Sequence, residues 1–214
     1  MSVIVPAITV ESQDEYKRSV EMIQSFASRV QIDITDGEFA PRYLVPAEEL
    51  WWPSNWTVDI HAMVMRPVEH VQNLINLKPS MIIFHAETGV NIMPVLDQVR
   101  AAGIKAGIAL LKTTVPASVI DIIKSVDHVL VFTGDLGHYG GTASMMQLEK
   151  VRLIRSINPE IEVGWDGGVN LDNAFTLSHS GVDVLNVGGA IAEAEDPARM
   201  YYELTQEINK KGVI

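Results

Sequence analysis

Residues 30–36 read Val-Gln-Ile-Asp-Ile-Thr-Asp, a stretch in which apolar and polar side chains alternate. Successive side chains of a β-strand point to opposite faces, so Ile32 and Ile34 share one face of an extended segment. The opposite face carries only polar groups: Gln31, Asp33 and Thr35. The isoleucines suit an apolar layer beneath helices, which directs the polar set into the interior of a barrel.

Similar short β-branched runs recur along the chain and alternate with amphipathic stretches. We expect eight strands at residues 3–9, 30–35, 57–64, 81–85, 105–111, 128–132, 161–166 and 183–187. We expect helices at residues 13–28, 67–77, 90–102, 116–124, 144–158, 171–180 and 197–211, with one irregular turn at 46–52. Strands that alternate with helices pair in parallel through right-handed crossovers. This length and pattern fit an α/β fold, a (β/α)8 TIM barrel with residues 1–214 in a single domain, better than an open doubly wound sheet.

The composition limits the classes of partner. The chain has 16 Lys and Arg against 27 Asp and Glu, a net charge of −11, and such a surface repels nucleic-acid phosphates and anionic lipid. Cysteine is absent, which excludes disulfides, thiolate nucleophiles and cysteine-bound metals. Residues 1–15 lack the pattern of a signal peptide, and no segment approaches the roughly 20 apolar residues that cross a bilayer. We therefore expect a cytoplasmic protein that binds neither nucleic acid nor membrane.

Polar groups also occupy the inward face of two other expected strands, with His61 in the third and Asp166 in the seventh. One inward aspartate or histidine is more often a hydrogen-bonded core residue. Several of them at carboxyl strand ends, however, lie where barrel enzymes hold their chemistry. Because strands two and seven lie on different sides of the ring, Asp33 and Asp166 can face each other across a ligand. Two carboxylates on opposite faces of one carbon can remove and return a proton with inversion.

Glycine pairs follow the sixth, seventh and eighth expected strands: Gly140, Gly141, Gly167, Gly168, Gly188 and Gly189. Backbone N–H groups in these loops, with a short helix after the last strand, form the usual phosphate pocket of such barrels. A single glycine pair also serves tight turns and close packing, but three in consecutive loops favour a phosphate site. Backbone N–H groups bind phosphate without net positive charge, so the acidic composition is compatible with this site.

Several segments resemble those of the ribulose-phosphate 3-epimerase family. They are QIDITDGEFAP (31–41), VDIHAMVMRPVEHV (58–71), IIFHAE (82–87), AGIAL (106–110), WDGGVN (165–170) and GVDVLNVGGAIAEAEDP (181–197). The resemblance covers nearly the whole chain and implies a ribulose-phosphate-binding barrel. It also implies interconversion of D-ribulose 5-phosphate and D-xylulose 5-phosphate by 1,1-proton transfer at C3, with a divalent cation polarising the C2 carbonyl. Such an electrophile is needed because a proton α to a ketone is a very weak acid.

The resemblance assigns roles to residues of this chain. It implies that Asp33 and Asp166 are the catalytic acid and base and also metal ligands, together with His61. The six glycines above correspond to the phosphate loops. Met63 corresponds to a methionine near the ligand, and His85 to the histidine of an F-H-x-E segment close to the site.

Departures from the family pattern cluster around the ligand. Gln31 stands where the family usually has a fourth, histidine ligand, and an amide oxygen is a poorer ligand for zinc or iron(II). The cofactor is therefore expected to be a divalent cation (Zn, Fe, Mn or Co), with its presence and identity left open. Gly164 replaces a usual carboxylate, and the loop GDLGHYGG (134–141) is one residue longer than usual and carries His138 and Tyr139. The sugar is consequently open as well.

The remaining candidates have plainer alternatives. If no cation binds, Lys112 or His138 is a candidate electrophile, although a solvated lysine and a hydrophilic loop explain them too. Surface positions are expected for the other histidines: His70, His128 and His179. We expect an epimerase-like isomerase, acting on a small phosphorylated sugar and, like its relatives, a homo-oligomer. The alternatives are an isomerase or lyase on another sugar phosphate, and a non-catalytic sugar-phosphate-binding protein.

Overall fold

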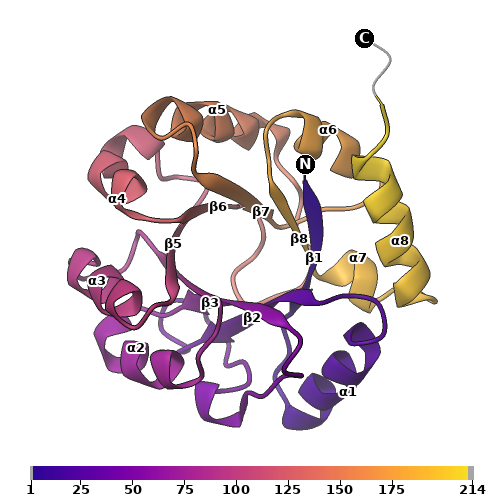
Figure 1. Ribbon diagram of the computed structural model, residues 1–214, viewed down its shortest axis with the longest axis horizontal. Helices are drawn as coiled ribbons and strands as arrows, with labels where there is room; N and C mark the ends of the chain where they lie inside the picture. Colours follow the sequence, from indigo (N-terminus) through magenta and orange to yellow (C-terminus); the bar gives the residue numbers. More distant parts are fainter. Residues whose placement is uncertain (1, 212–214) are drawn as a thin grey trace.

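The computed structural model describes residues 2–211, and its strands form a closed parallel barrel in the order β1-β2-β3-β4-β5-β6-β7-β8. They are β1 (Val3–Ile8), β2 (Arg29–Thr35), β3 (Thr57–Met63), β4 (Met81–His85), β5 (Lys105–Leu110), β6 (His128–Phe132), β7 (Glu162–Asp166) and β8 (Val184–Val187). Each expected strand is present, displaced by at most one residue at either end. The strands form a ring with the helices outside it (Figure 1), so the prediction of a (β/α)8 TIM barrel is confirmed.

Helices cover the outside of the ring. They are α1 (Gln13–Ile23), α2 (Pro67–Asn76), α3 (Met93–Ala101), α4 (Ile120–Ser125), α5 (Leu148–Ile157), α6 (Ala174–His179), α7 (Gly189–Ala192) and α8 (Pro197–Ile208), with 3-10 turns η1 (Ala47–Glu49), η2 (Pro116–Val119) and η3 (Met145–Gln147). The first helix begins at a capping box formed by Ser12 and Glu15, and it ends at Ile23, five residues before the expected end at 28. Between β2 and β3, η1 is the expected irregular turn.

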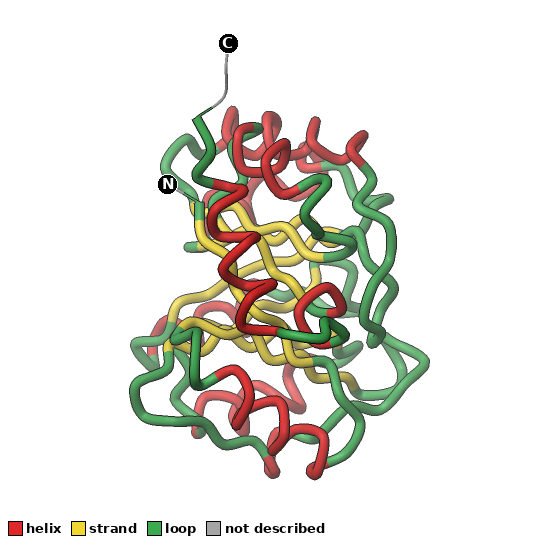
Figure 2. The backbone as a smooth tube through the Cα atoms, turned by 90° about the vertical axis from the view of Figure 1, so that its right-hand side faces the viewer, coloured by secondary structure: helices red, strands yellow, loops and turns green. Residues whose placement is uncertain are grey.

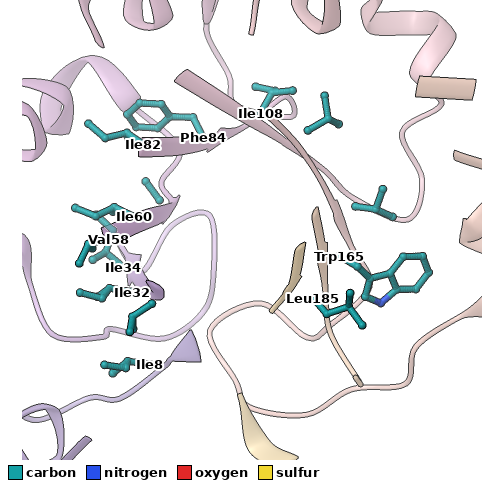
Figure 3. Packing of buried hydrophobic residues seen from close by; sticks show 14 of the residues in the cluster. Ile8, Ile32, Ile34, Val58, Ile60, Ile82, Phe84, Ile108, Trp165 and Leu185 are labelled. Atoms are coloured by element: carbon teal, nitrogen blue, oxygen red, sulfur yellow. The ribbon is translucent and has the colours of Figure 1, made fainter. Parts of the chain in front are cut away.

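The main hydrophobic core lies between the barrel and the helices. Ile32, Ile34 and Ile60 belong to it, and none of them is more than 3% exposed. Figure 3 shows these residues together with others of the same cluster, including Phe84 and Trp165. The alternation of side chains directs a second set to the barrel interior: Met81, Ile83, Ala109 and Leu130. The alternation of side chains along each strand thus separates the core between barrel and helices from the smaller apolar cluster inside the barrel.

The amino ends of the strands carry a network of ion pairs that we call the barrel floor, formed by Arg29, Asp59, His128 and Glu162. Arg29 donates to Asp59 at 2.8 Å and through two nitrogens to Glu162 at 2.9 Å. His128 Nδ1 lies 2.8 Å from Glu162 Oε2. The prediction of a surface position for His128 is therefore wrong. This residue is the first of β6, and its side chain is only 1% exposed. Gly164 makes room for it, since a Cβ there would lie 2.5 Å from His128 Nε2.

The register of the strands brings the polar inward residues to the opposite, carboxyl end of the barrel. Asp33 pairs in register with His61, and Asp166 with Phe132 and Asn186. Seen from the side, the helices lie along the barrel and the loops gather at its two ends (Figure 2). Over residues 2–211, no helix combines the length and apolar character needed to pass through a bilayer.

Candidate active site

Two aspartates from different sides of the barrel meet through one amide. Gln31 Nε2 donates to Asp33 Oδ1 at 2.9 Å and to Asp166 Oδ2 at 2.6 Å. Asp33 Oδ2 also accepts a hydrogen bond from Thr9 Oγ1 at 2.6 Å. Both aspartates are less than 10% exposed, yet both line the same cavity. The carboxylates expected to share a site are therefore close enough to act on one small ligand.

His61 completes a group of three potential metal ligands. Its Nδ1 lies 3.1 Å from Asp33 Oδ1 and 3.8 Å from Asp166 Oδ2, and its ring is fully buried. One ligand atom from each of the three residues lies within 4.8 Å of the other two. Carboxylate oxygens with one imidazole nitrogen suit a divalent transition-metal cation. The donor set therefore fits the divalent cation that the resemblance implies.

Gln31 presents its nitrogen, not its oxygen, to these three residues. Its Oε1 is buried and has no hydrogen-bond partner among residues 2–211. A half-turn of the amide about χ3 would exchange the two atoms and bring Oε1 to the side of the carboxylates, where it can only accept or ligate. The amide can thus serve the site in two ways, as a donor to two carboxylates or as an oxygen ligand to a cation.

The crowding of charged groups shifts their proton affinities. Burial and the charge of Asp33 raise the pKa of Asp166 to about 7. Burial lowers the pKa of His61, but the hydrogen bond to Asp33 and the charges of both aspartates outweigh it and raise the pKa overall. An acid whose pKa lies near the working pH can both give and take a proton. A bound divalent cation would instead favour ionised carboxylates.

Loop glycines line part of the cavity above the aspartates. Five of the six expected phosphate glycines line it: Gly140, Gly167, Gly168, Gly188 and Gly189. The sixth, Gly141, packs against the backbone of Gly134, from which a Cβ would lie 2.9 Å. Gly167 has φ +109°, and a Cβ there would lie 2.0 Å from Gly134 N, so only glycine lets the loops after β6 and β7 meet. These glycines therefore shape the loops that border the cavity.

The four residues expected near the substrate have different positions. Met63 and His138 line the cavity with the aspartates. Lys112 lies in an adjoining groove, which shares Phe132 and His138 with the cavity. His85 lies behind His61, with the two Nε2 atoms 2.9 Å apart, and burial lowers the pKa of His85 to about 4. The structure thus brings Met63 and His138 to the cavity but places Lys112 beside it and His85 behind its wall.

Thr9 is a site residue that sequence reasoning missed. Its hydroxyl holds Asp33, and its backbone N–H donates to Tyr139 Oη at 3.0 Å. The Tyr139 ring lies directly over Gly188, where a Cβ would be 2.6 Å from the ring, and burial raises the pKa of Tyr139 to about 12. Thr9 is a polar residue on the inward-facing side of the first expected strand, and this position could have identified it from the sequence.

Comparisons with known proteins agree with this fold and identify a family. The sequence model of the Ribulose-phosphate 3 epimerase family matches residues 3–192. The ribulose-phosphate 3-epimerase of Helicobacter pylori is 31% identical over 186 residues, which are 84% of this chain and 85% of that protein. The Mycobacterium bovis ribulose-phosphate 3-epimerase is 31% identical over 179 residues, 80% of this chain and 78% of that protein.

Solved structures share the fold at lower sequence identity. KGPDC from Streptococcus mutans has a TM-score of 0.76 at 13% identity, covering 97% of both chains. The 3-hexulose-6-phosphate synthase of Salmonella typhimurium has a TM-score of 0.72 at 14% identity, covering 97% of this chain and 98% of that one. These likenesses support the barrel alone, whereas the family match and the curated relatives confirm the resemblance seen in the sequence. The chain belongs to the ribulose-phosphate 3-epimerase family.

Proposed function

We propose that this chain epimerises a phosphorylated ketose, D-ribulose 5-phosphate to D-xylulose 5-phosphate or a close analogue, by proton transfer at C3. Family membership makes it an isomerase-class, epimerase-like enzyme. The observation that carries the finer proposal is the Gln31 amide, which holds a carboxylate from β2 and a carboxylate from β7 beside one cavity. Inversion at a carbon requires such a pair, one on each face.

In this mechanism the two aspartates divide the proton transfer. Asp33, held by Thr9 and Gln31, removes the C3 proton from one face of the sugar. Asp166 returns a proton to the opposite face of the enediolate. In the cation-free protein its pKa is raised to about 7, so there it can hold a proton near neutral pH. The reverse reaction uses the same groups with the roles exchanged. Each turnover therefore moves one proton onto Asp33 and one from Asp166, and proton exchange with solvent restores both groups.

The enediolate needs a positive partner near the C2 oxygen. Asp33, His61 and Asp166 would hold a divalent cation (Zn, Fe, Mn or Co), which when bound supplies the charge that polarises the C2 carbonyl. Gln31 would join them only after its amide turns. If no cation is used, His138 lines the cavity and Lys112 the groove beside it, and these are the candidates for the same role.

The phosphate of the sugar would bind in the loops after β6, β7 and β8. The glycines that line the cavity expose backbone at close range, and backbone N–H groups bind phosphate even in a chain of net charge −11. In this arrangement the phosphate lies on one side of the aspartates, and C3 of a five-carbon sugar lies above them.

Proton NMR in D2O tests the proposal. Wild-type protein with D-ribulose 5-phosphate should give xylulose 5-phosphate carrying deuterium at C3, in parallel runs with EDTA and with added Zn(II), Mn(II) or Fe(II). Asp166→Asn should lose turnover by about 10²–10⁴-fold while still binding the sugar phosphate. If no metal condition gives exchange or product, the pentose epimerase is wrong. Turnover of another sugar phosphate would then indicate a different isomerase or lyase, and binding without turnover a non-catalytic protein.

We also propose that the chain forms a homo-oligomer. Two large side chains in the loop between β2 and β3 are exposed, Tyr43 by 72% and Trp51 by 44%. Exposed aromatic groups of this kind are enriched at protein interfaces. Light scattering after gel filtration should give a mass above that of one chain, and a monomer at micromolar concentration would contradict it.

A further inference from the structure

A buried row of polar groups runs from Asp33 into the wall of the barrel. His61 Nδ1 lies 3.1 Å from Asp33 Oδ1, His61 Nε2 lies 2.9 Å from His85 Nε2, and His85 Nδ1 lies 3.4 Å from Glu87 Oε2. At the far end, the Leu111 backbone N–H donates to Glu87 Oε1 at 2.8 Å. We call His61, His85 and Glu87 the imidazole relay.

The fold builds this relay across neighbouring strands. In the register of β3 and β4, His61 lies beside Ile83, so His85 follows two residues further towards the carboxyl end. His85 lies beside Ala109 of β5, a residue with a small side chain. Glu87 comes just after β4, and the end of β5 anchors its carboxylate. Both histidine rings are fully buried, and the Glu87 side chain is 20% exposed.

An ionised Asp33 can accept a hydrogen from His61 Nδ1, but when that nitrogen is bare, as a cation ligand must be, the hydrogen bonds of the relay run in only one favourable direction. The two Nε2 atoms are in hydrogen-bond contact, so one of them donates and the other accepts. An ionised carboxylate only accepts, and Glu87 therefore takes the hydrogen of His85 Nδ1. A neutral His85 then has a bare Nε2, which accepts from His61 Nε2. The opposite direction needs a charged His85 between the rings of Phe39 and Phe132, whose centroids lie 4.6 and 5.6 Å away, and burial there disfavours the charge.

We propose that Glu87 and His85 are positioning residues that fix His61 with its hydrogen on Nε2 and its lone pair on Nδ1, aimed at the aspartate pair. Nδ1 is the His61 atom that faces both carboxylates, and a bare imidazole nitrogen is the form that binds a cation. The outer partner of a ligating histidine commonly sets its tautomer in this way. The proposal rests on the proposed function in one respect only, namely that the cation takes part in catalysis.

Two variants of His85 separate a tautomer effect from simple packing. His85→Gln keeps an acceptor at the position of Nε2, whereas His85→Leu fills similar space without one. In long-range 1H–15N NMR spectra of EDTA-treated protein, recorded at a pH where His61 carries a single hydrogen, wild type and His85→Gln should keep that hydrogen on Nε2. His85→Leu should move the hydrogen to Nδ1, where Asp33 accepts it. His61→Asn assigns the signal.

Cation affinity gives the second readout and needs no substrate. Zn(II) binding by calorimetry should weaken by about 10- to 100-fold in His85→Leu and Glu87→Ala, and recover to near wild type in His85→Gln. His128→Leu is the matched control, because it removes another buried histidine, one that lies in the barrel floor. It should lower stability and leave Zn(II) affinity unchanged.

The outcomes are distinct. An unchanged His61 tautomer in His85→Leu overturns the proposal, even if Zn(II) affinity falls, because the role of the relay would then be structural. Equal losses in His85→Gln and His85→Leu overturn it too. If the tautomer switches as expected but wild type shows no exchange with D-ribulose 5-phosphate, the relay stands and the proposed reaction fails. Glu87→Gln provides a milder change should Glu87→Ala disturb the loop at Leu111.

Discussion

The Gln31 side-chain nitrogen lies 2.6 Å from Asp166 Oδ2, although these residues come from β2 and β7. The same nitrogen donates to Asp33, so one neutral amide holds together two carboxylates that would otherwise repel each other. An amide NH2 has two hydrogens, and Gln31 directs both to the aspartate pair. A single imidazole nitrogen carries at most one. Gln31 therefore organises the pair by itself, through one hydrogen bond to each aspartate.

Gln31→His should strengthen cation binding. Imidazole nitrogen is a better ligand than an amide oxygen for borderline cations. We expect Zn(II) affinity of EDTA-stripped protein to rise by at least about tenfold, equivalent to roughly 1.4 kcal/mol, measured by calorimetry. Gln31→Leu, which removes the amide without adding a ligand, is the control. Equal Zn(II) affinity in the two variants would show that position 31 contributes no ligand atom.

Asp166→Asn should make the cation-free protein more stable at high pH. The pKa of Asp166 is raised to about 7 in the folded protein, so its contribution is fully present below the unfolded pKa and is lost as pH rises through about 7. Above that pH, wild type must bury a second carboxylate charge near Asp33, whereas asparagine carries none. In urea denaturation with EDTA, we expect Asp166→Asn to be about 1 to 2 kcal/mol more stable than wild type at pH 8.5. The difference should be smaller at pH 5, and a difference independent of pH would contradict the assignment.

The sequence was sufficient to predict the ring of strands because hydrophobic period and chain order determine it. Ile32 and Ile34 could be assigned to the helix-facing layer, and the opposite alternation then placed Asp33 inside. His128 opens an expected strand, but its assignment to the surface was wrong because its partner Glu162 lies on another strand. Pairings between strands distant in sequence are set by register, which no local pattern carries.

The same limit applies within the site. The residue types predicted that Asp33 and Asp166 would share a cavity, but which end of the Gln31 amide faces them depends on groups from another strand. Likewise, Thr9 gains its role from contacts with Asp33 and Tyr139, which the barrel alone brings together. Residue type and strand position were readable, whereas the direction of each hydrogen bond was not.

Tyr139→Phe should weaken substrate binding more than turnover. The phenol oxygen accepts from the Thr9 N–H and anchors the loop after β6, which borders the cavity. Loss of one buried hydrogen bond costs about 1 kcal/mol, so we expect KM for the sugar phosphate to rise about fivefold with a smaller change in kcat. Tyr202→Phe, at a 60% exposed position on α8, is the control and should behave as wild type. A fall in kcat at unchanged KM would instead give Tyr139 a part in the chemical step.

Glu162→Gln should destabilise the protein at neutral pH without changing catalysis, because the barrel floor lies at the end opposite the aspartates. Hydrogen bonds and charges from His128 and Arg29 overcome the effect of burial and lower the pKa of Glu162. Its stabilisation is therefore present above the unfolded pKa and is lost as pH falls through the lower, folded value. We expect a loss of about 1 to 3 kcal/mol at pH 7, measured by urea denaturation, since the side chain is partly exposed.

The difference between Glu162→Gln and wild type should shrink as the pH is lowered towards 3, because the unfolded chain then binds a proton at Glu162 that the folded protein, with its lowered pKa, does not. Glu149→Gln removes an exposed acid paired with Arg152 on α5, and it should leave the free energy of unfolding nearly unchanged at either pH. If Glu149→Gln and Glu162→Gln lower the free energy of unfolding equally, the ion pairs of the barrel floor stabilise the protein no more than an exposed pair does. If the Glu162→Gln loss is the same at pH 7 and pH 3, its origin is packing and not the paired charge.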